Sequence, residues 1–326
     1  MPNVFDSLLG LFRKKKSAAE DKPAAGPAAT TAPLPPRAIV TDPNATVPLP
    51  EIPNTLPMDT VKAQAANLAP KRLVLGIAQH VGRVRTHNED VLLFFTGELA
   101  GLESMPHFGL FVVADGMGGH ALGERASSLA ARNLARVALE GVLPSLLADP
   151  KGDADRPSLS EVMESAMNAA NKAVFSGVPE GGGTTLTCAL VIGEQVVMSH
   201  VGDSRAYIIS PDSFEQITRD HSLVQRLQEL GQLSAAEAAV HPQRNVLYRA
   251  VGQGEGLEVD VETRRLPSGS VLLLCSDGLW GLVPDEKMQT LIRQSPNPQA
   301  ACEALVAAAN AAGGPDNITA VMIQIP

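Results

Sequence analysis

The sequence is short of aromatic residues, which make up only 3% of its 326 residues and include a single tryptophan. The hydrophobic core must therefore be built from Ala, Val, Leu and Ile, and the apolar content of 44% is ample for a sizeable one. No stretch of about 20 apolar residues occurs, so the sequence predicts no helix that spans a bilayer.

Cysteine is equally scarce. Cys188, Cys275 and Cys302 lie in apolar contexts without the spacing of a metal site, which favours reduced core residues of a cytosolic protein. Basic residues are outnumbered, with a formal charge of −9, and the first 70 residues carry 7 Lys and Arg against 6 Asp and Glu. The acidic excess thus lies in the rest of the chain. Because binding to nucleic acid needs clustered Lys and Arg, we expect no nucleic-acid partner.

Several catalytic signatures are missing. No cysteine is followed six positions later by the arginine that a cysteine-dependent phosphatase requires. Neither the Gly-x-Ser-x-Gly nucleophile motif nor the Gly-Lys-Ser/Thr of a phosphate-binding loop occurs. The seven histidines never fall in a ligand-spaced pair, which argues against zinc.

The amino-terminal part falls into two segments. Residues 4–12 place apolar side chains at helical spacing, and the tetrapeptide Arg-Lys-Lys-Lys follows at 13–16. Because the basic cluster comes after the apolar part, residues 1–16 do not read as a signal peptide but as a short basic amphipathic segment. Such a segment contacts a membrane surface or a partner, or else it frays in solution. We expect a cytoplasmic protein, peripheral at the inner membrane face if residues 4–16 bind lipid.

Residues 17–70 contain no aromatic residue, and 12 of the 25 prolines lie among the first 70 residues. Such a composition cannot bury enough apolar surface to offset the entropy of ordering, so we expect a disordered or extended linker. The folded domain is predicted at 71–326.

Within 71–326 the apolar pattern predicts ten strands, at 73–79, 90–96, 110–114, 184–192, 196–201, 207–209, 215–218, 259–264, 271–275 and 318–325. Helices are predicted at 124–147, 160–176, 285–294 and 298–312. Gly123 and Ser158 are candidate caps of the first two helices. Residues 220–239 are predicted to be helical, polar and interrupted by Gly231, as in a mobile flap. Strand pairs separated by helix pairs indicate sheets covered by helices, and not a doubly wound parallel sheet.

Acidic residues stand where the apolar strands begin or end; they are Glu89, Asp90, Asp115, Asp277 and Asp316. Asp115 and Asp277 each follow an apolar run and precede glycine, which lets a ligand approach the backbone closely. A single acid of this kind could merely cap a turn. Several acids meeting at one sheet edge would repel one another, so a shared divalent cation is the simplest explanation. The all-oxygen donor set suits Mg²⁺ or Mn²⁺.

These residues belong to six motifs that follow one another in order. They are Gly82-x-x-Arg85-x-x-Asn88-Glu89-Asp90, Asp115-Gly116-Met117-Gly118-Gly119, Gly183-Thr184-Thr185, Gly202-Asp203-Ser204-Arg205, Ser276-Asp277-Gly278 and Gly314-Pro315-Asp316-Asn317. In this order they resemble the metal-dependent protein serine/threonine phosphatases of type 2C (the PPM family), in particular the bacterial members. The likeness covers about residues 72–325.

The resemblance implies an α+β fold, a four-layer α-β-β-α sandwich in which helices flank two packed antiparallel sheets. It also implies a binuclear site in a cleft at one end of the sandwich. The implied metal ligands are Glu89, Asp115, Gly116 through its carbonyl, Asp277 and Asp316. Asp115 would bridge the two ions, Glu89 and Gly116 would serve one, and Asp277 and Asp316 the other. Asp90 would hold metal-bound water, and Arg85 would grip the substrate phosphate with its forked donors.

The sequence departs from the family pattern at two places. Met117 stands where many eukaryotic members carry histidine, so no proton donor is assigned. Glu180 stands near the position of an aspartate that binds a third metal in bacterial members, which leaves a third ion open.

Other polar residues have two interpretations. Asp203 with Ser204 and Arg205 is more simply a turn with an internal ion pair than a metal ligand. His221, His241 and Arg244, assigned to the flap, are either surface residues or substrate contacts. Met117 and Trp280 are interpreted as packing residues near the cleft.

The resemblance implies that two Mn²⁺ or Mg²⁺ ions activate a water, which hydrolyses phosphoserine and phosphothreonine in proteins without a covalent intermediate. The substrates would be phosphorylated proteins, and the activity would oppose bacterial Ser/Thr kinases. Two alternatives stay open: a phosphatase of a small phosphorylated molecule, and a catalytically inactive module that binds phosphoproteins. The presence of every acid of the implied metal site argues against the inactive module.

Overall fold

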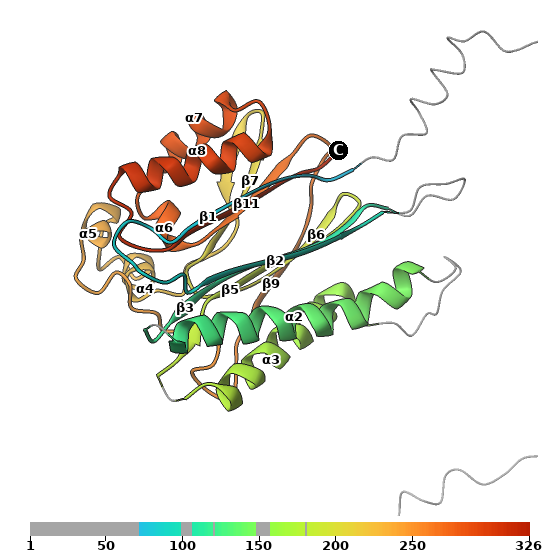
Figure 1. The fold of residues 1–326 in the computed structure, drawn as a ribbon, viewed down its shortest axis with the longest axis horizontal. Coiled ribbons are helices and arrows are strands. Elements are labelled where there is room, and N and C mark those ends of the chain that lie inside the picture. Colours follow the sequence, from blue (N-terminus) through green and yellow to red (C-terminus); the bar gives the residue numbers. More distant parts are fainter. Residues whose placement is uncertain (1–71, 99–105, 120, 148–156, 180) are drawn as a thin grey trace, which may run out of the picture. The chain divides into compact units, whose positions relative to one another are not determined.

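The computed structural model describes residues 72–98, 106–119, 121–147, 157–179 and 181–326 (Figure 1). All of them belong to the second of two units into which the chain divides, Met1–Leu56 and Pro57–Pro326. The segments predicted at 1–16 and 17–70 lie outside the described residues, as does Glu180.

Two antiparallel sheets form the centre of the domain. The first has the strand order β1 (Val74–His80), β11 (Ile318–Gln324), β10 (Val271–Cys275), β7 (Arg205–Ser210), β8 (Ser213–Gln216). The second has the order β2 (Asp90–Gly97), β3 (Phe108–Met117), β5 (Leu186–Ile192), β6 (Gln195–Val201), β9 (Asp260–Arg265), and the short β4 (Gly183–Thr184) pairs with β3.

Helices cover the outer face of each sheet. The pair α2 (Ala121–Leu147) and α3 (Leu159–Gly177) packs on the second sheet, and α7 (Asp285–Gln294) and α8 (Pro298–Ala311) lie over the first (Figure 1). Three shorter helices lie near one end (Figure 1): α4 (Leu223–Glu229) and α5 (Ala235–Ala239) between β8 and β9, and α6 (Asp277–Trp280) directly after β10. This is the predicted α-β-β-α sandwich, which is confirmed.

The most apolar strands are those covered on both faces. Along β3, Leu110 and Val112 pack among the helix-facing residues, whereas Phe111 and Val113 pack between the two sheets, and all four are fully buried. Successive side chains of a strand point to opposite faces, so a strand covered on both sides has no polar positions. This explains why the run at 110–114 is uniformly apolar.

The predicted ends of the helices can be compared with the structure. Ser158 caps α3 in a reciprocal capping box with Glu161, as its sequence position predicted. Gly123 is not a cap: α2 begins at Ala121, and Gly123 lies buried in its first turn. The predicted interruption at Gly231 is confirmed, because α4 and α5 are separate helices and Gly231 has a φ of 68° between them. The mobility of this segment stays a prediction.

The three cysteines are free and buried, which agrees with their prediction as core residues. Among the helices that the structure describes, none combines the length and apolar character needed to cross a membrane.

Helix α8 approaches β1 so closely that a side chain at Gly76 has no room. A Cβ there would lie 2.0 Å from the Pro298 carbonyl oxygen. We predict that Gly76→Ala lowers the free energy of unfolding by about 1–3 kcal/mol, as overpacking does. Gly97→Ala is the control, because its nearest neighbour, a Phe108 ring carbon, would be 3.6 Å away. Urea unfolding of both variants measures the difference, and equal stabilities would contradict the packing.

Candidate active site

Each sheet brings two acidic residues to the same end of the sandwich. In the second sheet, Asp90 and Asp115 are direct partners in the antiparallel pairing of β2 with β3. In the first sheet, Asp277 follows β10 and Asp316 precedes β11, and these strands are neighbours. Antiparallel pairing places the end of one strand beside the start of the next. The fold thus gathers acids that are up to 226 positions apart in the chain.

The gathered residues line one cavity of about 240 Å³. Its lining includes all but one of the predicted site residues: Arg85, Glu89, Asp115, Gly116, Asp277 and Asp316. The remaining one, Asp90, is only 5% exposed. Its charge interacts with that of Asp115, so it lies close to the lining.

Burial and mutual repulsion dominate the electrostatics of this cavity. Burial, reinforced by the nearby charges of Asp90 and Asp277, raises the pKa of Asp115 well above its usual range. Burial, followed by the charge of Asp316, raises the pKa of Asp277 to about 6. Carboxylates that resist ionisation in this way are stabilised by a cation.

Asp90 has one satisfied and one unsatisfied carboxylate oxygen. Its Oδ2 accepts hydrogen bonds from the Ser276 and Thr319 hydroxyl groups, each at 2.7 Å. Its Oδ1 is buried and has no hydrogen-bond partner. Burial raises the pKa of Asp90 to about 7, although these two hydrogen bonds lower it. A buried acceptor without a donor is costly, and the water that Asp90 is predicted to hold would supply that donor.

Arg85 provides the positive charge nearest to two of these acids. Its Nη2 lies 2.8 Å from Asp316 Oδ2, and its Nη1 lies 3.9 Å from Glu89 Oε1. Over the described residues, no three Asp, Glu, His or Cys side chains are grouped so as to hold one ion as they stand. The individual ligand assignments therefore stay predictions.

The donor chemistry nevertheless fits hard divalent cations. Buried carboxylates, repelling one another, form the walls, and neither histidine nor cysteine is among the described lining residues. All-oxygen sites of this kind are typical of Mg²⁺ and Mn²⁺. The absence of histidine there also leaves the proton donor unassigned, and Met117 lines the cavity as predicted.

Two supporting residues were not predicted from the sequence. Asn317 accepts the Glu89 amide N–H on its Oδ1 at 2.7 Å and donates from Nδ2 to the Val81 and His87 carbonyls. It thereby ties the loop before β2 to the start of β11. Gly123 makes room for Glu89, because a Cβ at Gly123 would lie 2.0 Å from Glu89 Oε2. Only the position of Asn317 beside Asp316 signalled its importance.

Three residues with open interpretations are now placed. Arg205 forms the expected internal ion pair, but with Asp220 at 2.8 Å rather than with Asp203. The carboxylate-lined cavity includes Asp203, and burial, followed by the charge of Asp277, raises the pKa of Asp203 well above its usual range. His221 is not a surface residue: it is 1% exposed, and its Nδ1 accepts the Gly202 N–H at 3.0 Å.

Comparison with known proteins identifies the family. The protein phosphatase 2C model matches residues 77–318. The chain belongs to this family. The serine/threonine phosphatase stp of Listeria innocua is 35% identical over 244 residues, which cover 74% of this chain and 92% of that protein.

Solved structures of bacterial phosphatases agree with this phosphatase 2C assignment. The Mycobacterium tuberculosis serine/threonine phosphatase PstP/Ppp is 33% identical with a TM-score of 0.63, over 78% of this chain and 98% of that one. The catalytic domain of PstP in complex with two manganese ions is 32% identical with a TM-score of 0.61, over 77% and 98% of the two chains. Metal dependence is a property of this family.

The space that Gly123 leaves for Glu89 can be tested directly. We predict that Gly123→Ala weakens Mn²⁺ binding about 10-fold, because displaced supporting groups cost metal sites this much. The substitution otherwise favours a helix by about 1 kcal/mol, so unfolding is not the expected cause. Gly256→Ala, where a Cβ would meet nothing within 4 Å, is the control. Calorimetric Mn²⁺ titration showing equal affinity in both variants would contradict the role of Gly123.

Proposed function

We propose that this chain hydrolyses phosphoserine and phosphothreonine in proteins and thereby opposes bacterial Ser/Thr kinases. One observation carries the proposal: a single cavity at one end of the sandwich collects an exposed arginine and the carboxylates of Asp115 and Asp277, whose pKa values are raised mainly by loss of solvent. The chain also belongs to the protein phosphatase 2C family, and its relatives are named serine/threonine phosphatases, which supports the same conclusion.

The positions of these residues support the roles that the family resemblance implies for them. Two divalent cations held by Glu89, Asp115, Gly116, Asp277 and Asp316 would lower the pKa of a water and neutralise phosphate oxygens. Arg85 is 46% exposed at its side chain and offers forked N–H donors to those oxygens. The free Oδ1 of Asp90 can accept a hydrogen bond from the attacking water. A water activated by two such cations would attack phosphorus directly, without a covalent intermediate.

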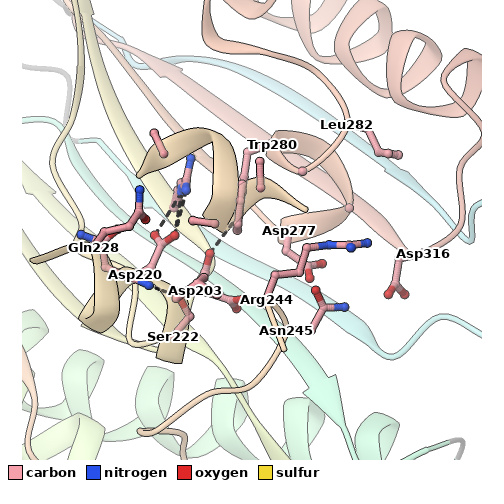
Figure 2. A pocket seen from close by; sticks show the side chains of 18 of the residues that line it. Asp203, Asp220, Ser222, Gln228, Arg244, Asn245, Asp277, Trp280, Leu282 and Asp316 are labelled. Carbon is pink, nitrogen blue, oxygen red and sulfur yellow. Dashed lines mark hydrogen bonds and ion pairs between the residues drawn. The ribbon is translucent and has the colours of Figure 1, made fainter. Parts of the chain in front are cut away.

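A second cavity supports a protein substrate over a small phosphorylated molecule. It has a volume of about 430 Å³ and shares Asp203, Asn245, Asp277 and Asp316 with the first (Figure 2). Residues of α4 and α5 line one part of it and Trp280 and Leu282 another. Space of this size beside the phosphate site suits the residues that flank a phosphorylated side chain.

The activity assay uses a phosphothreonine peptide with Mn²⁺ or Mg²⁺. We predict turnover that a chelator abolishes, and Asp115→Asn protein that stays folded but loses at least about 100-fold in rate. The fold survives because removing one charge from the cluster reduces repulsion. Metal-dependent binding without turnover would favour the inactive module, and normal turnover by Asp115→Asn would refute its bridging role. The relative rates with the two ions decide which cation serves better.

A substitution at Arg244 tests whether the substrate is a protein or a small phosphorylated molecule. It lines the larger cavity, and the structure gives it no ion pair with any described residue. We predict that Arg244→Gln lowers kcat/KM for a phosphopeptide with acidic flanking residues about 10-fold, as loss of a charged hydrogen bond does. The rate with p-nitrophenyl phosphate should not change. Arg132→Gln, on the exposed side of α2, is the control. Equal losses on both substrates would favour a small phosphorylated molecule.

We further propose that the enzyme is cytoplasmic and that residues 4–16 bind the anionic inner face of the membrane. Their apolar spacing and the basic tetrapeptide at 13–16 support this. The full-length chain should sediment with phosphatidylglycerol vesicles but not with phosphatidylcholine vesicles. Changing the four basic residues to glutamine should abolish sedimentation. A full-length chain that stays in solution with both kinds of vesicle would contradict membrane binding.

A further inference from the structure

Three side chains, those of Arg205, Asp220 and Trp280, lie beside the carboxylates, because they line the larger cavity but not the smaller one. Arg205 donates to Asp220 through Nε at 3.0 Å and Nη2 at 2.8 Å, which makes a forked ion pair. The same guanidinium lies over the ring of Trp280, with its central carbon 3.5 Å from the ring centroid. Cation–π contacts and forked ion pairs are both strongly oriented interactions.

Most of the hydrogen-bonding capacity of Arg205 is engaged within the protein. Its Nε and Nη2 are occupied by Asp220, and its Nη1 donates to the Tyr207 hydroxyl at 3.3 Å. One of its faces is covered by Trp280. With three of its five N–H groups and this face engaged, the guanidinium of Arg205 is fixed in place and can hold other groups.

Trp280 links this group to Asp277. Asp277 and Trp280 are the first and last residues of α6, a single turn of helix. The turn is packed tightly, because a Cβ at Gly278 would lie 1.9 Å from the Asn317 carbonyl oxygen. A ring held by Arg205 at one end of so short a helix restricts the orientation of the carboxylate at the other end.

Trp280 also links the group to the loop that carries Asp203. Its Nε1 donates to the Asp203 carbonyl oxygen at 2.9 Å, as the dashed line between these residues in Figure 2 shows. In the sheet, Arg205 is the direct partner of Cys275. Asp203 stands two residues before Arg205 and Asp277 two residues after Cys275. The antiparallel pairing therefore brings both acids to the same end, and Trp280 joins them.

Asp220 connects the group to the base of the α4–α5 segment. The next residue, His221, donates its backbone N–H to the Gly202 carbonyl at 2.7 Å and accepts the Gly202 N–H on Nδ1 at 3.0 Å. Ser222 then caps α4. The ion pair of Asp220 thus joins the start of this segment to the strand end that precedes it.

We propose that Trp280, held by the Arg205–Asp220 ion pair, is a positioning residue that sets the affinity of the carboxylate cluster for divalent cations. It does so by fixing the turn of Asp277 and the loop of Asp203. The inference rests on the proposed metal-dependent function, and it extends that function to three side chains outside the predicted set of metal ligands.

The test is calorimetric Mn²⁺ titration of full-length variants. Trp280→Phe keeps a ring over Arg205 but removes the N–H to Asp203, whereas Trp280→Leu removes both contacts. Arg205→Lys keeps the charge but loses the fork. We expect Kd to rise about 3-fold for Trp280→Phe and at least about 10-fold for the other two, as for groups that orient metal ligands. Arg265→Lys, in the exposed ion pair with Glu194, is the matched control and should leave Kd unchanged.

Two further measurements separate positioning from general stability. Thermal unfolding gives the folded fraction, and kcat at saturating Mn²⁺ should return to within about 2-fold of the parent value, because only cation affinity is changed. Variants that melt earlier but bind Mn²⁺ with the parent Kd would overturn the proposal, as would lost kcat that excess Mn²⁺ does not restore. A parent protein that binds no Mn²⁺ would instead refute the proposed function itself.

Trp280 also reports on the site directly, because it is the only tryptophan of the chain. We expect its fluorescence emission in the unmodified protein to change during Mn²⁺ titration with the midpoint found by calorimetry. Emission that stays constant while calorimetry shows binding would overturn the link between the ring and the cluster.

Discussion

Burial of several like charges at one end of two packed sheets is the constraint on which the active site depends. Loss of solvent raises the pKa of Asp90, Asp115 and Asp277, and the charges of neighbouring carboxylates raise each of them further. A fold that brings such groups together is destabilised unless positive charge is supplied. Arg85 supplies part of that charge to Asp316 and Glu89, and divalent cations are the chemistry that would supply the remainder.

The sandwich holds these charges in place because each comes from a strand end. Strand β3 is covered on both faces and cannot shift register without exposing its apolar side chains, so the position of Asp115, the partner of Asp90, is fixed. Asn317 then joins the two sheets across the site through its hydrogen bonds to Glu89, Val81 and His87. In contrast, the α4–α5 segment is held at its base, where Leu223 donates to Val246 and Tyr248 donates to His221. The site thus combines a fixed centre with a separately attached segment that lines the larger cavity beside it.

The central strands and the acids at their ends could be predicted from the sequence. Strands covered on both faces give long apolar runs, and two of these runs end in Asp-Gly. The acids Glu89, Asp115, Asp277 and Asp316 of the carboxylate cavity were found at predicted strand ends, and Arg85 was assigned from the family resemblance. Asn245 and Leu247, which also line the cavity, were not predicted. The pairing of Arg205 with Asp220, the burial of His221 and the room that Gly123 makes for Glu89 were not predicted either. Each depends on which segments become neighbours in the folded chain, and no local spacing encodes that. For the same reason the sequence pattern indicates only a packing role for Trp280. Its partners Arg205 and Asp203 lie more than 70 positions away in the chain.

The central claim is that the carboxylates of both sheets hold divalent ions together. Anomalous scattering at the manganese edge, from crystals grown with Mn²⁺, measures this most directly. The account predicts two strong peaks about 3.5–4 Å apart, as in other two-metal sites. Asp115 should lie between the two peaks, and Asp277 and Asp316 should contact one of them. Peaks absent from this cavity, or bound by residues of one sheet alone, would contradict it.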